Sequence, residues 1–265
     1  MKKQSATNED FIRLWHNCEA DTNKKAFAEL EERTLTTLHK IQALHKDSAA
    51  IAYSGGKDSL VLQHLANRAG ISKGVLGSPV SLEYTSFMSW LRQHKGADIT
   101  ILDTGQDLDF LRANPQYLFP SDSKVRAQWY KAVQHKAQED YYDEEKLTAL
   151  LLGRRVQDGN YTGAKGASGY VAKGRLRLNP IAYWTHTDIF YYLKTYKIPL
   201  PPIYDFARGW RCGTHAWNVR SRSGGLSCDN VMSEIMIIEP TIIREAADKL
   251  TIVSDFLRRY CSGSI

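Results

Sequence analysis

Short apolar runs alternate along this chain with segments whose apolar residues recur every three or four positions. The runs have the length of buried strands, and the recurring pattern is typical of helices that bury one face. The predicted strands cover residues 49–53, 98–102, 146–153 and 175–181, with one more at either 73–76 or 80–82. The predicted helices between them cover residues 58–69, 85–94 and 122–139. This alternation predicts an α/β fold with a doubly wound, mostly parallel sheet, in which ligands bind at the carboxyl ends of the strands.

Both ends of the chain predict helical additions to that sheet. Residues 8–46 have the helical period in two pieces, broken around residues 21–23. Residues 240–260 predict a closing helix with a buried apolar stripe, and we expect Cys261, which lies beside that stripe, to pack against the core. We therefore expect an N-terminal helical segment at 1–47, an α/β domain at 48–205, and a C-terminal segment at 206–265 packed on the same domain.

Residues 158–196 contain a glycine-rich segment and, after it, the start of a helix. Residues 158–174 contain five glycines and no hydrophobic period, which predicts a mobile loop that is either a lid over a ligand or plain disorder. Thr185 with Asp188 three residues later is typical of a capping box, so we expect a helix that runs to Tyr196. His186 is expected as an exposed residue in the first turn of that helix.

One turn has the residues of an anion-binding site. Where the strand at 49–53 ends, Ser54-Gly55-Gly56-Lys57-Asp58-Ser59 leads into the next helix. Gly55 and Gly56 can take positive φ and let successive backbone N–H groups point at an anion. The helix that starts near Asp58 adds the positive end of its dipole, and Lys57 adds a mobile cation. The spacing of a Walker A loop is absent, and the plain alternative is a glycine turn with a solvated lysine.

These six residues resemble the PP-loop of the adenine nucleotide alpha-hydrolase superfamily, whose members cleave ATP between its α and β phosphates. A second stretch, from Asn179 to Asp205, resembles the proline, tryptophan-threonine, aspartate and isoleucine-proline pattern of the phosphoadenosine phosphosulfate (PAPS) reductase family, which includes the small subunit of ATP sulfurylase. The two stretches cover most of residues 49–205. The resemblance implies an ATP-binding, Rossmann-like domain, and it does not extend to residues 1–45 or 206–265.

The candidate site residues follow the predicted strands. The resemblance implies that the nucleotide is bound by Ser54, Gly55, Gly56, Lys57, Asp58, Ser59, Asp103 and Gly153, with Asp58 as a Mg²⁺ ligand. Arg154 and Arg155 leave a strand end, where they can fork onto phosphate or sulfate oxygens, so we expect them to act in catalysis with Lys57. The plain alternatives are a solvated basic turn at the arginines and, at Asp103, an aspartate that begins a turn before Gly105.

Composition narrows the class of protein. Of the 265 residues, 43% are hydrophobic and 24% charged, which is ordinary for a soluble globular protein. The net charge of +6 suits a polyphosphate or nucleic-acid partner without requiring one. The four cysteines form no Cys-x-x-Cys pair, so we expect no zinc site and no iron–sulfur cluster. An apolar leader and runs of membrane-spanning length are absent, so we expect a cytoplasmic protein without a membrane partner.

The resemblance leaves two chemistries and one binding role. In the first, the PP-loop and Mg²⁺ hold the β and γ phosphates of ATP while an oxyanion attacks the α phosphorus, which releases pyrophosphate and adenylylates the acceptor. In the second, a cysteine thiolate, Cys212 or Cys261, attacks the sulfur of a sulfonucleotide such as PAPS. The third is nucleotide sensing without turnover. We favour the first because the PP-loop is intact and the cysteine motifs of the reductases are missing.

The acceptor is expected to meet the unmatched C-terminal part. A basic and aromatic string there could line the pocket of an anionic acceptor, sulfate or another oxyanion, or could bind nucleic acid through phosphate contacts and stacking. Its residues are Arg208, Trp210, Arg211, Cys212, His215, Trp217, Arg220 and Arg222. A partner subunit and a homo-oligomer both stay open.

Overall fold

The computed structural model describes residues 6–212, 216–217 and 227–262, and for Cys212 it describes the backbone alone. The chain forms two compact units. Unit 1 comprises Met1–Leu76, His94–Leu102 and Lys136–Leu200, and unit 2 comprises Gly77–Gln93, Asp103–His135 and Pro201–Ile265. The three-part division expected from the sequence stays a prediction.

Six strands form one sheet. They are β1 (Ala49–Ala52), β2 (Gly74–Ser78), β3 (Ile99–Asp103), β4 (Ala149–Leu152), β5 (Gly169–Ala172) and β6 (Arg175–Leu178). Their order in space is β3-β2-β1-β4-β6-β5. β1 runs parallel to β2 and β4, β4 runs parallel to β6, and β5 is antiparallel to β6. The expected α/β fold with a mostly parallel sheet is confirmed, and the second strand takes the earlier of its two predicted positions.

The helices of unit 1 begin where the sequence supplies caps. They are α1 (Asn8–Asp21), α2 (Lys24–His45), α3 (Lys57–Arg68), α7 (Lys136–Glu144) and α8 (His186–Thr195). Thr7 and Asp10 form a capping box at the start of α1, and Thr185 and Asp188 form the predicted one at the start of α8. The break expected between the first two helices is present at residues 22 and 23.

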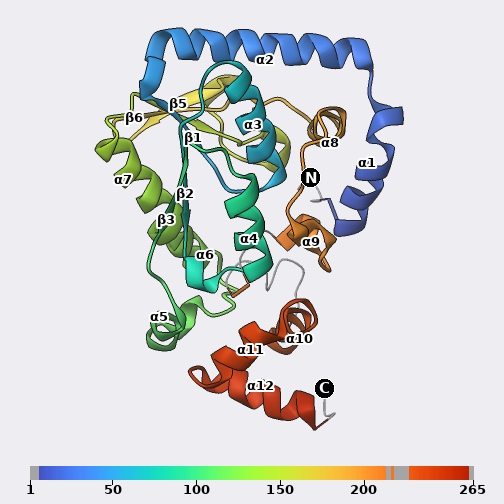
Figure 1. Ribbon diagram of the computed structural model, residues 1–265, viewed down its shortest axis with the longest axis vertical. Helices are drawn as coiled ribbons and strands as arrows, with labels where there is room; N and C mark the ends of the chain where they lie inside the picture. The colour runs from blue at the N-terminus through green and yellow to red at the C-terminus, as the bar shows by residue number, and fades with distance from the viewer. Residues whose placement is uncertain (1–5, 213–215, 218–226, 263–265) are drawn as a thin grey trace. The chain divides into compact units, whose positions relative to one another are not determined.

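Helices cover both faces of the sheet in unit 1, because side chains alternate between the faces along each strand. On one face the cluster packed against α7 consists of Ala50, Ala52, Val75, Tyr141, Tyr142, Leu147, Leu150 and Leu152. Figure 1 shows α3 and α8 on the side of the sheet away from α7. There α2 and α3 contact β1, and α3 contacts α8. The result is a layer of helices on each side of a buried sheet, which is the doubly wound arrangement.

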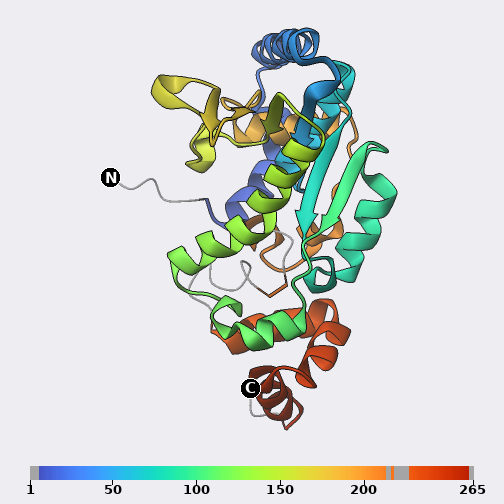
Figure 2. The same cartoon turned by 90° about the vertical axis from the view of Figure 1, so that its left-hand side faces the viewer.

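Residues 158–174, expected to form a mobile loop, are partly built into the sheet. Their last part forms β5, which pairs with β6 as a hairpin, and Figure 2 shows this hairpin in yellow at one end of the sheet. Glycine suits position 169 of β5, because a Cβ there would meet Leu178 Cδ2 at 2.8 Å. The Lys173 ammonium in the turn lies 2.9 Å from the Glu139 carboxylate of α7. The prediction of a mobile loop is wrong for the part that forms β5, where Gly169 allows close pairing with β6.

Unit 2 is mainly helical. Its helices are α4 (Thr85–His94), α5 (Leu108–Ala113), α6 (Ser123–Tyr130), α9 (Gly209–Cys212), α10 (Cys228–Ile238), α11 (Pro240–Ala247) and α12 (Thr251–Cys261). The single closing helix predicted at residues 240–260 is therefore two helices, and Cys261, expected to pack, is exposed. None of the helices in the described ranges has both the length and the apolar character needed to cross a membrane.

The order of the strands marks one place in the sheet for a ligand. The chain moves outward from β1 through β2 to β3 on one side and then returns to place β4 on the other side of β1. The carboxyl ends of β1 and β4 lie beside each other, with Ala52 opposite Leu152. In open α/β sheets the crevice at such a switch point binds ligands. The PP-loop follows β1 and Gly153 follows β4, so the sheet brings these two predicted site segments together.

Candidate functional site

The PP-loop turns from β1 into α3 through two glycines with different conformations. Gly55 has φ 69°, which favours glycine, whereas Gly56 is extended with φ −80° and ψ 160°. We expected positive φ to be open to both, and the structure uses it at Gly55 alone. Gly56 is the N-cap residue of α3 and supplies no side-chain cap. The positive end of α3 therefore begins at this loop, as an anion-binding turn requires.

The Ser59 side chain forms hydrogen bonds with the backbone of the PP-loop. Its buried hydroxyl donates to the Gly56 carbonyl oxygen at 2.8 Å and accepts from the Ser54 backbone N–H at 3.2 Å. The Ser54 hydroxyl lies 3.1 Å from the Ser59 hydroxyl and accepts from the Gly56 N–H at 3.3 Å. Ser54 is exposed, so of the two serines it is the one that faces solvent. The structure thus gives Ser59 a role in shaping the loop.

Asp58 joins two cations beneath the loop. Its Oδ2 lies 2.8 Å from Lys57 Nζ, and its Oδ1 lies 2.8 Å from Arg155 Nε. Burial acts to raise the pKa of the Asp58 carboxyl, but the charges of Lys57 and Arg155 outweigh it and hold the pKa below its ordinary value. Asp58 is therefore a carboxylate that links the PP-loop to the end of β4.

Arg155 is fully buried, with a side-chain exposure of 0%. Besides Asp58, its guanidinium contacts the Asp158 carboxylate at 3.0 Å, the Trp184 carbonyl oxygen at 3.2 Å and His186 Nδ1 at 2.9 Å. We expected this arginine to fork onto phosphate oxygens. The structure instead engages its donors with protein groups, so its position supports the site from within.

His186 differs from its predicted place, because only 8% of it is exposed. Arginine has no acceptor, so the contact with Arg155 identifies Nδ1 of His186 as the lone-pair nitrogen and Nε2 as the protonated one. Burial, followed by the charges of Arg155 and Lys57, lowers the pKa of His186 to about 4. Burial also raises the pKa of Asp158, whose Oδ1 lies 3.7 Å from His186 Nε2. Sequence periodicity gave no signal for this burial, because the partners come from other elements.

Gly153 lets the end of β4 approach the PP-loop. A Cβ at this position would lie 3.3 Å from the Asp58 carbonyl carbon and 3.4 Å from the Ser59 nitrogen. The next residue, Arg154, is half-buried, and its Nη1 donates to the Tyr170 hydroxyl at 2.9 Å. The structure therefore places Gly153 beside the loop, whereas the Arg154 side chain contacts Tyr170 of β5.

Asp103 lies at the carboxyl end of β3, within unit 2. Its Oδ1 accepts from the Gly105 N–H at 3.0 Å and from the Val80 N–H at 3.3 Å. These contacts match the plain alternative, an aspartate that begins a turn. The other predicted site residues belong to unit 1, and each unit is described by itself.

Asp58 does not fit the Mg²⁺ site expected of it. Magnesium prefers oxygen ligands in octahedral geometry, and both oxygens of this carboxylate face cationic nitrogens at 2.8 Å. Within the described residues, no group of three or more His, Cys, Asp or Glu side chains is placed to hold a metal ion. Asp58 is thus corrected from a metal ligand to an internal ion-pair partner.

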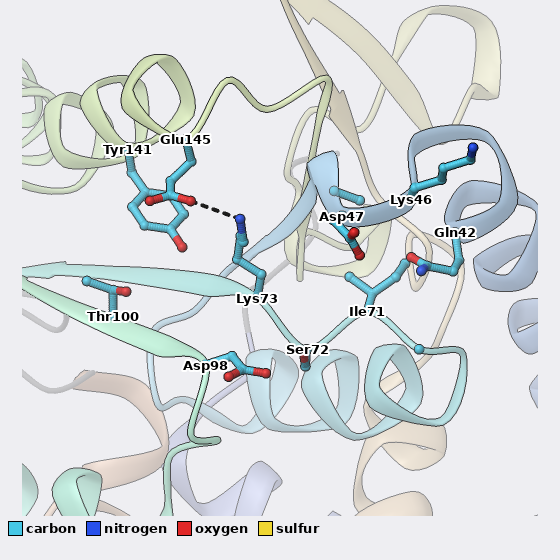
Figure 3. Close-up of a pocket in the computed structure, with 12 residues that line it drawn as sticks. Gln42, Lys46, Asp47, Ile71, Ser72, Lys73, Asp98, Thr100, Tyr141 and Glu145 are labelled. Carbon is cyan, nitrogen blue, oxygen red and sulfur yellow. Dashed lines mark hydrogen bonds and ion pairs between the residues drawn. The ribbon is translucent and has the colours of Figure 1, made fainter.

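A cavity of about 380 Å³ lies at the opposite edge of the sheet, lined by Ala49, Lys73 and Asp98, where β1, β2 and β3 begin. Figure 3 shows the Lys73 ammonium paired with the Glu145 carboxylate there, at 2.8 Å. Parallel sheets bind ligands at the carboxyl ends of their strands, whereas this cavity lies at their amino ends.

Some of the predicted residues lie outside the described part of the chain: His215, Arg220 and Arg222, together with the side chain of Cys212. Of those described, Arg208 pairs with Glu234 at 2.7 Å within unit 2. The basic and aromatic string therefore stays a prediction as a whole.

Comparison with known proteins identifies a family. Residues 48–212 match the family described as the phosphoadenosine phosphosulfate reductase domain. A search of curated proteins found no match. The structure is similar to that of PAPS reductase from Candida auris in its phosphate complex, with 12% identity, 76% of this chain and 93% of that chain covered, and a TM-score of 0.47.

Two further structures are similar at comparable levels. FMN adenylyltransferase from Candida glabrata, in complex with FAD and inorganic pyrophosphate, has 14% identity, covers 76% of this chain and 71% of its own, and gives a TM-score of 0.44. U34-tRNA thiolase from Methanococcus maripaludis, with its 4Fe–4S cluster, has 18% identity, covers 95% and 79%, and gives 0.47. At such identities the likeness does not bear on activity.

The last of these structures corrects one expectation. We expected no iron–sulfur cluster, because the chain lacks Cys-x-x-Cys pairs, yet the thiolase of similar fold carries one. Cluster ligands can come from cysteines far apart in a sequence, so local spacing does not decide the question. The expectation of no zinc rested on the same spacing. Both expectations are withdrawn.

Proposed function

The chain belongs to the phosphoadenosine phosphosulfate reductase domain family, and from this premise we propose that it binds ATP at the PP-loop and cleaves it between the α and β phosphates. The observation that carries the proposal is the glycine turn at the switch point of the sheet. Gly55 takes positive φ, and Gly56 begins α3 without a side-chain cap. Such a turn presents backbone N–H groups and a helix dipole to a phosphate.

Lys57 and Arg154 are the cations that we assign to the phosphates. Both follow the carboxyl ends of the two central strands, and Lys57 is tied to the loop by its pairing with Asp58. Arg155 keeps Asp58 in place from the buried side. In this proposal Arg155 is a positioning residue, whereas Lys57 and Arg154 contact the nucleotide.

The proposed reaction transfers an adenylyl group. An acceptor oxyanion attacks the α phosphorus, the bond between that phosphorus and the bridging α–β oxygen breaks, and pyrophosphate leaves with the bond's electron pair. Negative charge builds up on the departing pyrophosphate, and fixed cations and N–H donors in a partly dry site stabilise such charge strongly. The acceptor is an anionic oxygen, from a sulfate-like ion or from a nucleic acid.

ATP–pyrophosphate exchange with a panel of acceptors tests this proposal. We expect labelled pyrophosphate to enter ATP when the right acceptor is present, because formation of the adenylylated product is then reversible. Measurable ATP binding with no exchange for any acceptor would favour the alternative of a nucleotide-sensing protein. Absence of ATP binding would refute the proposal outright.

Reduction of a sulfonucleotide is the second candidate, because the family takes its name from that reaction. It requires a thiol, and Cys261 is exposed near the end of α12. We expect Cys212→Ser and Cys261→Ser to leave the activity unchanged. Loss of PAPS reduction in either variant would replace our proposal with the reductase.

A further inference from the structure

The N-terminal helix α1 lies outside the segment that matches the family, yet it reaches the PP-loop. In unit 1, α1 packs against α8, and Figure 1 shows the two helices beside each other. The capping box of Thr7 and Asp10 fixes where α1 begins, and Phe11 is the next residue. Phe11 is 6% exposed, so this end of the helix is buried against the rest of the unit.

The Phe11 ring contacts the PP-loop lysine. Lys57 Nζ lies 5.6 Å from the centroid of the ring, which is within the range of a cation–π contact. The same ammonium lies 2.8 Å from Asp58 Oδ2, and the lysine side chain is 11% exposed. A buried aromatic face and a carboxylate therefore both hold the ammonium of Lys57.

Phe11 also contacts the residue that supports the loop from the other direction. Its ring meets the His186 ring edge-on, with centroids 4.8 Å apart and an interplanar angle of 89°. His186 contacts Arg155, and Arg155 contacts Asp58, the partner of Lys57. These contacts lead from Lys57 through Phe11, His186, Arg155 and Asp58 back to Lys57. They connect four parts of unit 1: α1, the start of α3, the end of β4 and the start of α8.

We propose that Phe11 is a positioning residue that holds Lys57 for the nucleotide phosphates, so that α1 is part of the nucleotide site. Flexible lysine side chains have many conformations in solution, and binding must restrict them. In this protein the restriction is built in before the nucleotide arrives, because Phe11 and Asp58 already select one position. The inference deepens the proposed ATP site and, as far as it concerns ATP, rests on it.

Nucleotide binding by Phe11 variants tests the inference, with Phe27 as the matched control. Phe27 is likewise 6% exposed, and its ring packs edge-on against Tyr191 of α8 at 4.7 Å. Phe11→Leu keeps apolar bulk but loses the π face, so we expect it to weaken ATP binding about threefold to tenfold. Phe27→Leu should bind ATP as the wild type does, and Phe11→Trp, which keeps a π face, should bind ATP better than Phe11→Leu.

The reactivity of Lys57 separates this inference from the proposed function, because it needs no nucleotide. The protein is treated with an amine-acetylating reagent, and the modified lysines are quantified by mass spectrometry, with Lys73 as the internal reference. We expect Phe11→Leu to raise the rate at Lys57 about threefold and Phe27→Leu to leave it unchanged.

The outcomes are distinct. Unchanged Lys57 reactivity together with unchanged ATP affinity in Phe11→Leu would overturn the inference and leave the ATP site standing. Equal weakening by Phe11→Leu and Phe27→Leu would also overturn it, because the effect would then come from general loosening of α8. A wild-type protein that binds no ATP but shows the raised Lys57 reactivity in Phe11→Leu would refute the proposed function and keep the contact.

Discussion

Ion pairs between basic and acidic side chains lie at both ends of the central strands, but they are buried at the carboxyl ends and exposed at the amino ends. At the carboxyl ends, Arg155 is fully buried and contacts Asp58, Asp158 and His186. At the amino ends, Lys73 and Glu145 pair at 2.8 Å with side chains 34% and 42% exposed, beside a cavity of about 380 Å³. The cavity and the exposed ion pair thus lie at the amino ends, and the buried charges lie at the carboxyl ends.

This difference shows what identifies a candidate site in such a fold. Exposed ion pairs contribute little because water already solvates both charges. Buried charges are costly unless their partners are placed with care, so a buried network beside a glycine turn indicates a specific purpose. We therefore assign the nucleotide to the carboxyl ends of β1 and β4, where the backbone and the charges converge, rather than to the cavity.

The largest expected effect follows from removing Arg155. In Arg155→Met, Asp58 and Asp158 lose their buried cation, and uncompensated buried charges typically cost about 3–5 kcal/mol of folding free energy. Urea denaturation of the variant and the wild type measures this loss. A loss below about 1 kcal/mol would show that the buried network does not bear on stability.

A pH dependence centred on His186 is the next largest effect. Its pKa falls from 6.5 in the unfolded chain to about 4 in the folded protein, so between these values the unfolded chain binds more protons. Stability is therefore expected to fall as the pH drops from about 6.5 to 4, by up to about 3 kcal/mol. Asp158, whose pKa is raised, offsets part of the loss, because it favours the folded state as the pH falls.

The variant His186→Gln tests this assignment. Glutamine keeps an acceptor for Arg155 but does not titrate, so the slope of stability between pH 6.5 and 4 should flatten. The control is His45→Gln at the other end of the sheet, where His45 Nδ1 lies 2.8 Å from the Thr148 hydroxyl. A slope that survives in His186→Gln would assign the acid sensitivity to another group.

Glycine substitutions at the two ends of the strands are expected to have smaller effects on stability and to differ in ATP binding. Gly55 in the PP-loop and Gly70 beside the cavity both have positive φ, 69° and 84°. Alanine in this region costs about 1–2 kcal/mol, so Gly55→Ala and Gly70→Ala should lose similar stability. ATP binding, measured by calorimetry, should weaken in Gly55→Ala alone. Equal binding in the two variants would contradict our placement of the nucleotide.

The smallest effect is expected at the amino ends. Glu145→Gln breaks the exposed pair with Lys73 and should change stability by no more than about 0.5 kcal/mol, because such pairs are worth little. Urea denaturation at low and high salt measures it. A larger change would show that the exposed pair at the amino ends also contributes substantially to stability, which would contradict the contrast between the two ends.

The sequence predicted the parts of this fold that depend on local pattern. The alternation of strands and helices gave the α/β fold, and the capping pair of Thr185 and Asp188 gave the start of α8. The PP-loop was predicted at the end of β1, and Gly153 was predicted beside it, because strand ends meet at one edge of a parallel sheet. The first three features are decided by residues close in the chain, and the position of Gly153 follows from the general geometry of parallel sheets.

What could not be predicted depends on residues far apart in the chain. The burial of Arg155 and His186 follows from packing among α1, β4 and α8, which no periodicity encodes. Phe11 gave no signal, because a single aromatic residue on an amphipathic helix is normally core. β5 was expected to be part of a loop, because Gly169 serves a close contact with β6, a strand that comes later in the chain.

The most direct test of the account is ATP binding by Lys57→Ala, measured by isothermal titration calorimetry beside Lys73→Ala. Lys57 lies in the PP-loop, and Lys73 lines the cavity at the opposite edge of the sheet. A charge-assisted contact to phosphate is worth about 1.5–3 kcal/mol, so we predict at least tenfold weaker binding in Lys57→Ala and wild-type affinity in Lys73→Ala. Wild-type affinity in Lys57→Ala would contradict the assignment of the nucleotide to the PP-loop.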